Sequence, residues 1–581
     1  MSAFERLRAK IGSTTERQRF GALFAFAFAV RLIYLHEIQG SLFFDTLLGD
    51  ASTYDAWATQ LKDDWVGTQV FFQAPLYPYF LGCIYAVFGH DLWLVRVVQM
   101  ALGSASCVLL AAAGRAFFTR NVGYVSGLVL AVYAPALFFD GLVQKATLDL
   151  FLTTSLLFFL GKIESAGGRR FFVLAGAALG ALALTRENAL IWLPCLLGWL
   201  LWRAPRSEWR QAARQQLAPF ALGVALILAP VVARNFAVGG EFFLTTSQFG
   251  QNFYIGNHAH ADGTYQSLRF GHGGARFERQ DAIDLAEAAA GHSLSPAEVS
   301  HYWASRAWSF IEESPGEWLA LLTKKWFLVW NARELPDSDE PLVYADQAPL
   351  FAALSHLVSF ASVCPLSFAG ALLAFRERRR TRILHVLVVS LAASTALFFV
   401  FARYRYPLLP MLILFAVFGI FRAREALRAR QFSLLVRLAA VVVAGIVIGH
   451  LDIAPAESPR ATAYYDLGVS LEQLERPSDA KASYLQALSA NPEFVEAHVN
   501  LGSLLARSGD FEPAAFHERS ALRLKPDDAV AHANLGNILL EQGNDEEARF
   551  HYGEALRLDP AQAEAREGLA ILKEKNSKTT L

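Results

Sequence analysis

Apolar runs long enough to cross a lipid bilayer fill most of residues 20–450, and they constrain the fold more than any other feature of the sequence. A membrane helix needs about 20 mostly apolar residues, and the sequence offers about eleven such segments. They lie near residues 20–38, 92–117, 122–140, 146–162, 171–185, 188–202, 217–233, 350–375, 383–401, 405–421 and 434–450. Hydrophobic residues make up 54% of the chain and charged residues 18%, a more apolar balance than that of soluble proteins. We therefore predict an all-α, polytopic membrane helix bundle over residues 1–450.

The short loops between the apolar runs predict the orientation of the bundle. In membrane proteins, Lys and Arg are enriched in the cytoplasmic loops. The basic clusters of this chain lie at residues 1–19, 115–120, 162–170, 203–214, 376–382 and 422–430. With about eleven spans every basic cluster falls on one side, so we predict a cytoplasmic N-terminus.

Residues Pro75–Phe88 form a further apolar segment that we do not count as a span. Counting it would invert every later loop and would place the basic clusters outside. We predict instead a juxtamembrane or re-entrant helix on the outer face, where protein covers its backbone. Residues 39–91, residues 236–349 and the tail after residue 451 then face the outside. Helical patterns around Glu287–Leu322 predict a helical lid in the second of these regions.

The C-terminal residues 461–581 repeat with a period of about 34 residues. The repeated positions are a Leu-Gly pair, a small residue and a closing proline, namely Leu467-Gly468, Leu501-Gly502 and Leu535-Gly536, then Ala487, Ala521 and Ala555, then Pro492, Pro526 and Pro560. This pattern is the signature of tetratricopeptide repeats (TPRs). We predict a TPR solenoid that follows a linker at 451–460 and ends in a capping helix. Such solenoids present a concave binding surface, so we expect a protein or peptide partner.

Net charge and cysteine content exclude some functions. A net charge of -1 gives no sign of the basic surface that binds nucleic acid. Each cysteine lies in an apolar stretch and none sits in a Cys-x-x-Cys spacing; they are Cys83, Cys107, Cys195 and Cys364. We expect buried free thiols rather than a disulfide or a zinc site.

The first outer loop opens an ordered series of polar and aromatic motifs. The loop carries Gly49-Asp50-Ala51-Ser52-Thr53-Tyr54, Ala56-Trp57-Ala58 and Gln73-Ala74-Pro75-Leu76-Tyr77-Pro78. Later motifs are Arg96, Thr185-Arg186-Glu187-Asn188, Asn257, Trp330-Asn331 with Glu334, and Ala402-Arg403-Tyr404-Arg405-Tyr406-Pro407. In order and sidedness these motifs resemble the protein O-mannosyltransferase and aminoarabinose-transferase branch of the GT-C glycosyltransferases. The resemblance covers most of residues 20–420.

This resemblance implies a glycosyltransferase that moves a sugar from a polyprenyl-phosphate donor to a hydroxyl acceptor on the non-cytoplasmic face. Direct attack by the hydroxyl would invert the anomeric centre. The TPR tail is predicted on the same side of the membrane as Asp50, which favours a protein acceptor over a lipid. The resemblance also implies a cell membrane, namely the inner membrane of a bacterium, and the same topology would suit the endoplasmic reticulum.

Each step of this reaction calls for a particular side chain. The acceptor hydroxyl is a weak nucleophile, so a carboxylate must accept its proton, and we predict Asp50 for this role. The departing lipid phosphate needs charge stabilisation, for which the planar fork of arginine is well suited. Arg403 and Arg405 are the leading candidates, followed by Arg186 and Arg31. The resemblance further implies substrate contacts by Tyr54, Gln73, Tyr77 and Glu334, and acceptor contacts by Asn500 and Asn534, which resemble the asparagine ladder of some TPR glycosyltransferases.

Each of these assignments has a structural alternative. Asp50 would also suit a cap of the following helix, predicted at Ser52–Leu61. Arg403 and Arg405 would also suit interfacial anchors that reach the lipid headgroups. Glu334 either faces the acceptor or ends a helix. Asparagines at the two TPR positions would also suit a solvated helix face.

The chain departs from the resemblance at one position. Many relatives carry two adjacent carboxylates in the first loop, whereas this chain has Asp50-Ala51. Asp55 and Asp140 are the candidates for a second carboxylate. Asp140 and Lys145 also bracket a turn between two spans, a spacing that predicts a salt-bridged hairpin.

Histidines in the second outer loop raise the question of a metal. They are His258, His260, His272, His292 and His301. A His-x-His spacing can bind a divalent metal, but no acidic partner lies at a diagnostic distance along the chain. We assign no metal ligand and no cofactor, and leave a divalent metal open.

Two other classes of function compete with the glycosyltransferase. A non-catalytic membrane scaffold would recruit partners through its TPRs, but it leaves Asp50 and the Pro-Leu-Tyr-Pro motif at 75–78 unexplained. A transporter would be expected to show inverted repeats among its spans, and no clear internal duplication is present there.

Overall fold

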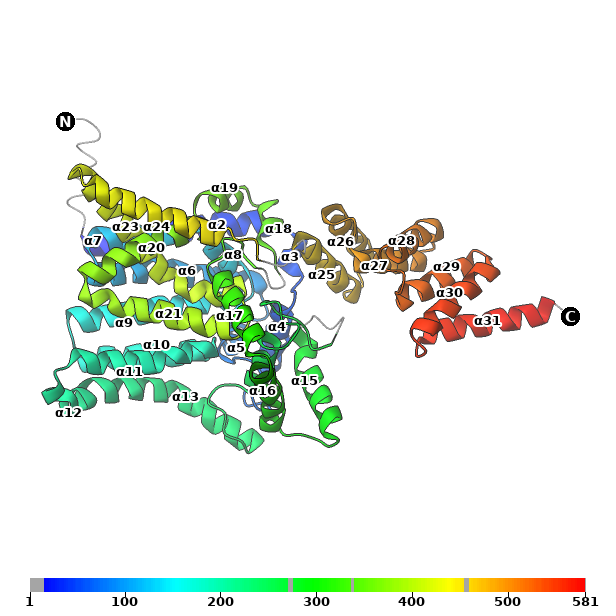
Figure 1. Cartoon of the computed structure of the whole chain (residues 1–581), viewed down its shortest axis with the longest axis horizontal. Coiled ribbons are helices and arrows are strands. Elements are labelled where there is room, and N and C mark those ends of the chain that lie inside the picture. Colours follow the sequence, from blue (N-terminus) through cyan, green and yellow to red (C-terminus); the bar gives the residue numbers. More distant parts are fainter. Residues whose placement is uncertain (1–14, 270–274, 336–338, 454–458, 580–581) are drawn as a thin grey trace. The chain divides into compact units, whose positions relative to one another are not determined.

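The computed structural model describes residues 15–269, 275–335, 339–453 and 459–579. Residues 1–14 of the basic N-terminal segment, His272 and residues 454–458 of the predicted linker 451–460 lie outside this described part. The chain divides into two compact units, one within residues 1–337 and 344–455 and the other within residues 338–343 and 456–581. Every regular element of the described chain is a helix (Figure 1), which confirms the predicted all-α class.

The first unit is a bundle of long apolar helices. Eight helical segments of the described chain are long and apolar enough to cross a membrane. They contain α2 (Glu16–Ile38), α6 (Leu92–Phe117), α9 (Ala146–Ser165), α13 (Ala218–Gly239), α20 (Phe360–Glu377), α21 (Arg382–Leu397), α23 (Leu409–Arg428) and α24 (Phe432–Gly449). A ninth crossing results if α7 (Arg120–Ala131) and α8 (Ala134–Gly141), which meet at a bend of 54°, form one broken span. A polytopic bundle is therefore confirmed.

Two of the predicted spans coincide with shorter helices. These are α10 (Arg169–Ala183), with 15 residues, and α11 (Trp192–Arg203), with 12 residues. The short 3₁₀-helix η1 (Glu187–Ile191) separates them. The predicted number of eleven spans stays a prediction.

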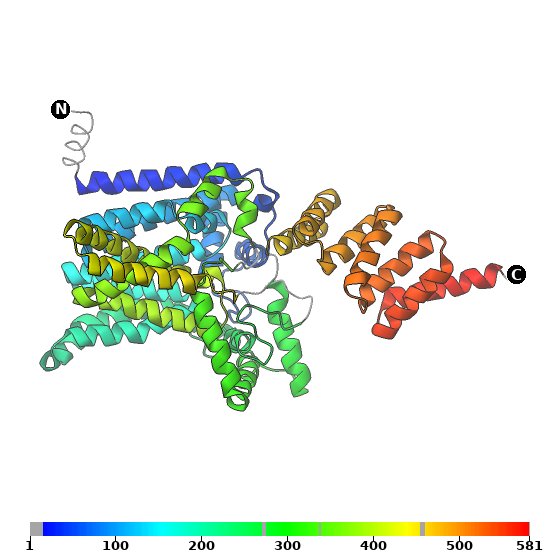
Figure 2. The ribbon, with the colours of Figure 1, turned by 45° about the horizontal axis from the view of Figure 1, so that its top comes forward.

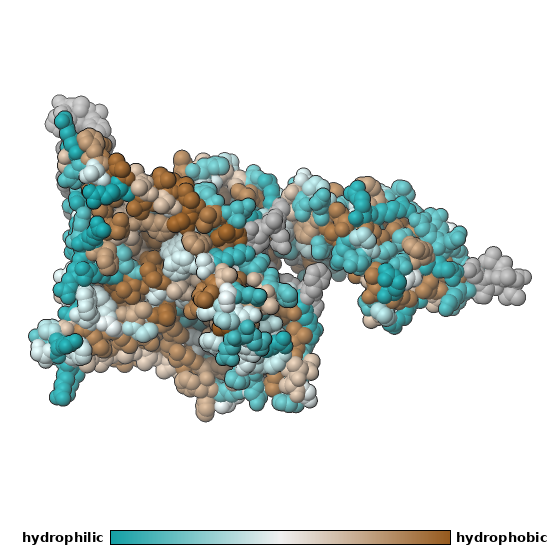
Figure 3. All heavy atoms as spheres, in the orientation of Figure 1, coloured by the Kyte–Doolittle hydropathy of each residue, from teal (hydrophilic) through white to brown (hydrophobic). Residues whose placement is uncertain are grey.

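The helices of the bundle lie side by side and present apolar surface along their length (Figure 3). The short helix α12 (Trp209–Ala212) lies at one end of this unit (Figures 1 and 2). At the opposite end lie α4 (Asp50–Gln60), α5 (Leu76–Phe88), α15 (Ala275–Ala290) and α16 (Pro296–Glu313). With 13 residues α5 is also shorter than the about 20 residues of a regular membrane helix, and its length is compatible with the predicted juxtamembrane helix.

Glycines allow the closest helix contacts in the bundle. A Cβ atom on Gly176 of α10 would lie 2.0 Å from the Phe220 carbonyl oxygen of α13. A Cβ atom on Gly370 of α20 would lie 1.8 Å from the Phe415 carbonyl oxygen of α23. Because neither distance is compatible with a side chain, these pairs use the small-residue packing that is common between membrane helices.

The second unit contains three helix pairs and a final helix, which confirms the predicted TPRs. The elements are α25 (Pro459–Gln473), α26 (Pro477–Ala490), α27 (Val495–Arg507), α28 (Phe511–Leu524), α29 (Ala529–Glu541), α30 (Asp545–Leu558) and α31 (Ala563–Thr579). In each pair the glycine of the Leu-Gly motif faces a large side chain of the second helix. This side chain is Tyr484 in the first repeat, Glu518 in the second and Tyr552 in the third. A carboxylic acid thus occupies the buried position that a tyrosine fills on either side.

Glu518 is fully buried in the middle repeat. Its Oε1 accepts a hydrogen bond of 3.0 Å from Asn534 Nδ2, and its Oε2 has no partner among the described residues. Burial raises the pKa of the Glu518 carboxyl well above its usual value, and the bond from Asn534 opposes this only in part. Since the unfolded chain releases this proton near the ordinary carboxyl pKa, the stabilisation is complete below that pH and is lost as the pH rises towards the folded-state pKa.

We expect Glu518→Gln to stabilise α27–α30 by about 1–3 kcal/mol at pH 8 and to have little effect at pH 4, because it removes the charge but keeps an acceptor. Amide hydrogen exchange in the intact protein, corrected for its intrinsic pH dependence, measures this. The matched control is Glu512→Gln, an exposed carboxylate on the same helix. Equal protection of wild type and Glu518→Gln at both pH values would contradict the prediction.

Candidate active site

Asp50 is the first residue of α4, a helix that lies at the end of the bundle opposite α12 (Figure 1). The residue before it, Gly49, has a φ of 51°, a conformation that favours glycine and that turns the chain into the helix. The Asp50 side chain makes no capping bond to the α4 backbone. Its Oδ2 instead accepts bonds from Arg403 Nη1 at 2.5 Å and from Tyr54 OH at 3.3 Å, and its Oδ1 accepts one from Gln73 Nε2 at 3.4 Å.

The surroundings of Asp50 favour its ionised form. The residue is only 8% exposed, and burial by itself would raise the pKa of its carboxyl. The positive charges of Arg403 and Lys145, with the hydrogen bonds from Arg403 and Tyr54, outweigh burial and hold the pKa of Asp50 below its usual value. Asp50 is therefore a carboxylate ready to accept a proton at neutral pH.

Arg403 and Arg186 both lie close to the ring of Tyr404. The Arg403 guanidinium lies 5.3 Å from the ring centroid and the Arg186 guanidinium lies 4.9 Å from it. Arg186 also forms a two-pronged ion pair with Asp149, through Nε at 2.8 Å and Nη2 at 2.6 Å. Asp149 was not predicted as a site residue. An acidic residue inside an apolar span is the signal that would have identified it.

Lys145 adds a third cation to this region. It precedes α9, is 8% exposed, and lies within electrostatic range of Asp50, Arg186 and Arg403. Its Nζ lies 6.0 Å from the centroid of the Tyr54 ring. Three cations thus lie close to the Asp50 carboxylate, while Asp149 is bound to Arg186 and Glu187 lies within electrostatic range of Lys145. Cations beside a proton acceptor suit the binding of a phosphate group.

The predicted salt bridge between Asp140 and Lys145 is wrong. Asp140 Oδ2 accepts a bond of 2.8 Å from Arg31 Nε, and both side chains are fully buried. The helix α8 directs Asp140 towards α2 and α6, where Gly103 leaves room for its carboxylate, since a Cβ atom there would lie 2.0 Å from Asp140 Oδ2. Asp140 and Arg31 therefore compensate each other's charge inside the bundle.

Arg405 and Glu334 contact each other rather than Asp50. Arg405 donates to the backbone carbonyls of Val329, Asn331 and Arg333 at 2.5–3.2 Å and to Glu334 Oε2 at 3.0 Å. Its guanidinium also lies 3.9 Å from the centroid of the Phe360 ring. These contacts hold the 329–334 segment, whereas Arg403 contacts the carboxylate of Asp50.

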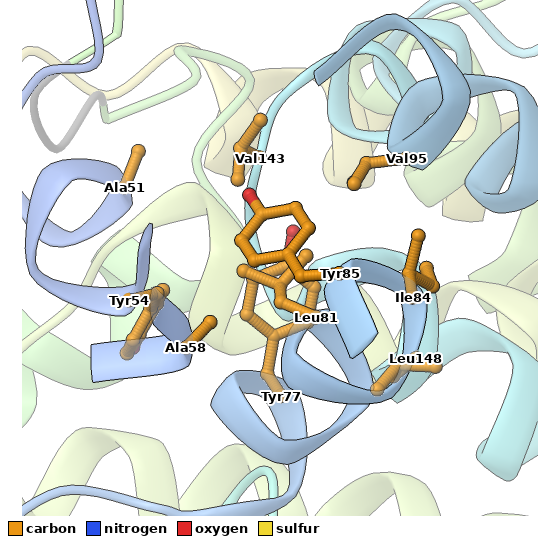
Figure 4. Packing of buried hydrophobic residues seen from close by; sticks show 10 residues of the cluster. All are labelled: Ala51, Tyr54, Ala58, Tyr77, Leu81, Ile84, Tyr85, Val95, Val143 and Leu148. Carbon is orange, nitrogen blue, oxygen red and sulfur yellow. The ribbon is translucent and has the colours of Figure 1, made fainter. Parts of the chain in front are cut away.

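Tyr54, which bonds to Asp50, belongs to an apolar cluster that also contains Tyr77 and Tyr85 (Figure 4). The rings of Tyr54 and Tyr77 meet edge to face with centroids 5.4 Å apart. Tyr77 OH donates to Gln99 Oε1 at 2.6 Å, and Gln99 Nε2 donates to the carbonyls of Asp140 and Leu142. Gln99, a buried amide of α6 that the sequence did not single out, thus joins the floor of the site to the turn before α9.

The other sequence candidates lie in different surroundings. Asp55, also on α4, accepts bonds from Tyr85 OH at 2.6 Å and from His90 Nε2 at 2.8 Å. Within the described residues no three His, Cys, Asp or Glu side chains are arranged to hold a metal ion. In the TPR unit, Asn500 Nδ2 donates to Tyr465 OH at 3.1 Å, and Asn534 Nδ2 donates to Glu518.

The helical bundle with this charged end matches a known family over part of its length. Residues 73–233 match the family model of dolichyl-phosphate-mannose-protein mannosyltransferases. Residues 465–529 and 529–562 match two models of tetratricopeptide repeats. These matches confirm the resemblance to GT-C glycosyltransferases with C-terminal TPRs that the sequence motifs indicated.

Similar solved structures include three membrane glycosyltransferases. ArnT from Cupriavidus metallidurans, bound to undecaprenyl phosphate, is 16% identical with a TM-score of 0.41, over 90% of this chain and 79% of that one. The Archaeoglobus fulgidus oligosaccharyltransferase complex with Zn and sulfate is 14% identical with a TM-score of 0.43, over 80% and 56% of the two chains. The S. cerevisiae protein O-mannosyltransferase Pmt1-Pmt2 complex bound to the sugar donor is 18% identical with a TM-score of 0.33, over 40% and 36%.

The match to the yeast complex therefore spans only about a third of that relative, and the match to the archaeal enzyme just over half. No protein with a curated description matches the chain.

The buried pair of Arg31 and Asp140 yields a test of the bundle interior. Asp140→Leu alone leaves Arg31 as a buried unpaired charge, and we expect a loss of about 3–5 kcal/mol in the free energy of unfolding. The double variant Arg31→Met/Asp140→Leu should recover most of this loss, because it removes both charges. Thermal unfolding in detergent measures the difference. A double variant that is less stable than either single variant would contradict the pairing.

Proposed function

We propose that this chain is a membrane glycosyltransferase that transfers a sugar from a polyprenyl-phosphate donor to a hydroxyl acceptor. The observation that carries the proposal is the buried, ionised Asp50 with Arg403 bound to it and Lys145 and Arg186 close by. A carboxylate supplies a proton acceptor, and adjacent cations supply a site for a phosphate leaving group. The match of residues 73–233 to the mannosyltransferase family supports the same chemistry.

The reaction we propose is a single displacement. The acceptor hydroxyl loses its proton to Asp50 while its oxygen bonds to the anomeric carbon of the sugar. The bond from that carbon to the polyprenyl-phosphate oxygen breaks, and the lipid phosphate departs with its electron pair towards Arg403, Lys145 and Arg186. One carboxylate is sufficient for this reaction, which inverts the anomeric configuration.

Donor binding would also tune the base. In the free protein the positive charge of Arg403 lowers the pKa of Asp50. A phosphate group that binds Arg403 compensates part of this charge, so the pKa of Asp50 rises towards its usual value and the carboxylate becomes a better proton acceptor. The donor thus would prepare the base for the acceptor.

For the acceptor we propose a protein, bound through the TPR unit on the non-cytoplasmic side of a cell membrane with the N-terminus in the cytoplasm. The basic loops support this orientation. Asn500 and Asn534 use their amide nitrogens within the array, which leaves the amide oxygens to accept a bond from a peptide N–H. Tyr54, Gln73 and Tyr77 are the proposed lining of the sugar site.

Asp50→Asn should lower the transfer rate by about 10²–10⁴-fold, the usual contribution of a general base. Membranes that contain the wild-type or variant chain are supplied with radiolabelled polyprenyl-phosphate sugars, and label is counted in protein and in lipid fractions. The matched control is Asp63→Asn, an exposed carboxylate just after α4. Equal label in the wild type and Asp50→Asn would exclude the base and favour a scaffold, and label in lipid alone would exclude a protein acceptor.

The pH dependence of transfer offers a second test. Because the pKa of Asp50 is lowered in the free protein, kcat/KM should stay level as the pH falls through the ordinary carboxyl range near about pH 4. Arg403→Gln removes the charge that lowers this pKa, so its activity should begin to fall at a higher pH. The test compares the shapes of the two profiles rather than their heights. Coincident acid limbs would contradict the role of Arg403 beside Asp50.

A further inference from the structure

Lys325 is a fully buried lysine in α17 (Pro315–Val329), away from the residues assigned to the reaction. Its Nζ donates three hydrogen bonds, to the Gly256 carbonyl at 2.8 Å, to the Phe398 carbonyl at 2.9 Å and to Asn257 Oδ1 at 3.0 Å. An ammonium group has three donors, so this environment satisfies all of them. All three acceptors are uncharged.

Such an environment is costly for a positive charge. Burial lowers the pKa of Lys325 to about 7. An apolar side chain of the same length would fill the space without this penalty, so packing alone does not account for a lysine. Ionisable groups whose pKa is strongly shifted by burial are concentrated at functional sites. The position of the three acceptors in the chain therefore indicates what Lys325 does.

Asn257, one of the three acceptors of Lys325, makes further hydrogen bonds of its own. Its Oδ1 accepts a bond of 3.0 Å from Trp318 Nε1 as well as the one from Lys325. Its Nδ2 donates to the carbonyls of Phe253 and Leu397, both at 2.8 Å. The orientation of the Asn257 side-chain amide is therefore fixed by two donors to its oxygen and two acceptors of its nitrogen. It joins the end of α14 (Phe249–Gly256) to the end of α21.

The segment held in this way is the connection from α21 to α22 (Ala402–Arg405). The carbonyls of Leu397 and Phe398 accept the bonds from Asn257 and Lys325, and the Val400 and Ala402 amides donate to the carbonyls of Gly263 and Leu335. Gly256 permits the approach, because a Cβ atom there would lie 2.2 Å from the Phe398 carbonyl oxygen. Ala402, the last residue of this connection, is followed directly by Arg403.

We propose that Lys325, acting through Asn257 and the Phe398 carbonyl, is a positioning residue that fixes the 397–402 connection and so places Arg403 against Asp50. The proposal rests on the proposed glycosyltransferase function. It assigns Lys325 no contact with substrate. Its role is to hold the arginine that contacts both the base and the donor phosphate.

Lys325→Met tests this role, because methionine keeps the length of the side chain and removes all three donors. We expect amide exchange at Val400 and Ala402 to accelerate by about tenfold or more in the intact protein, while exchange in α6 is unchanged. We also expect transfer to fall by about tenfold to a hundredfold. The acid limb of kcat/KM should move to higher pH, as in Arg403→Gln, a change that a general loss of folded protein would not produce. The matched control is Lys324→Met, the neighbouring and partly exposed lysine of the same helix.

Unchanged exchange at Val400 and Ala402 in Lys325→Met would overturn the proposal. Accelerated exchange with unchanged transfer and an unchanged acid limb would overturn it as well. Acceleration spread equally over α6 would show a purely structural lysine and would also exclude a positioning role. If the wild-type chain transfers no sugar, the proposed function fails on its own account, and the exchange at the two amides still decides whether Lys325 holds the connection.

Discussion

A charge buried inside the helical bundle must meet an opposite charge or a full set of hydrogen-bond partners, and this constraint links the elements of the first unit. Three ion pairs each connect parts of the chain that are distant in sequence. Arg31 with Asp140 joins α2 to α8, Arg186 with Asp149 joins the segment before η1 to α9, and Arg403 with Asp50 joins α22 to α4. Breaking any one of them would leave an unpaired charge in a low-dielectric interior.

These pairs differ in what surrounds them. The pair of Arg31 and Asp140 is fully buried within the bundle and has a structural role. The pair of Arg403 and Asp50 lies at the end of the bundle, is slightly exposed, and has two more cations beside it. A substrate with a negative charge can replace one partner only where further cations are close by. The same kind of interaction therefore occurs inside the bundle in one place and in the proposed site in another.

The sequence predicted the helical class, the TPRs and the two ends of the central ion pair. Asp50 and Arg403 are each predicted for separate reasons, and the fold brings them together although they lie 353 positions apart in the sequence. The predicted pair of Asp140 and Lys145 is wrong because closeness in sequence does not determine which charge Asp140 meets in space. The rotation of α8 and the space at Gly103 decide the partner of Asp140, and neither can be inferred from spacing.

Residues that act through other residues were harder to predict. Gln99 and Lys325 look like ordinary members of apolar or amphipathic helices, and their importance lies in backbone carbonyls that only the folded chain brings near. Asn257 was part of a recognised motif, but its partners Trp318 and Lys325 come from a helix with no matching signal. Side chains whose partners are backbone groups leave little trace in a single sequence.

The acid at the centre of the TPR unit has a consequence for how the array moves. In stacked repeats, stability is a sum of terms within each repeat and between neighbours, so a weak middle repeat divides the array into two halves. In the outer repeats Tyr484 and Tyr552 pack against the glycine of the Leu-Gly motif. In the middle repeat Glu518 takes this position, and one of its carboxylate oxygens has no partner among the described residues. Opening would then begin at the centre rather than fray from the ends. An extended polypeptide that contacts all three repeats would connect the two halves and would reduce the motion of the array as it binds.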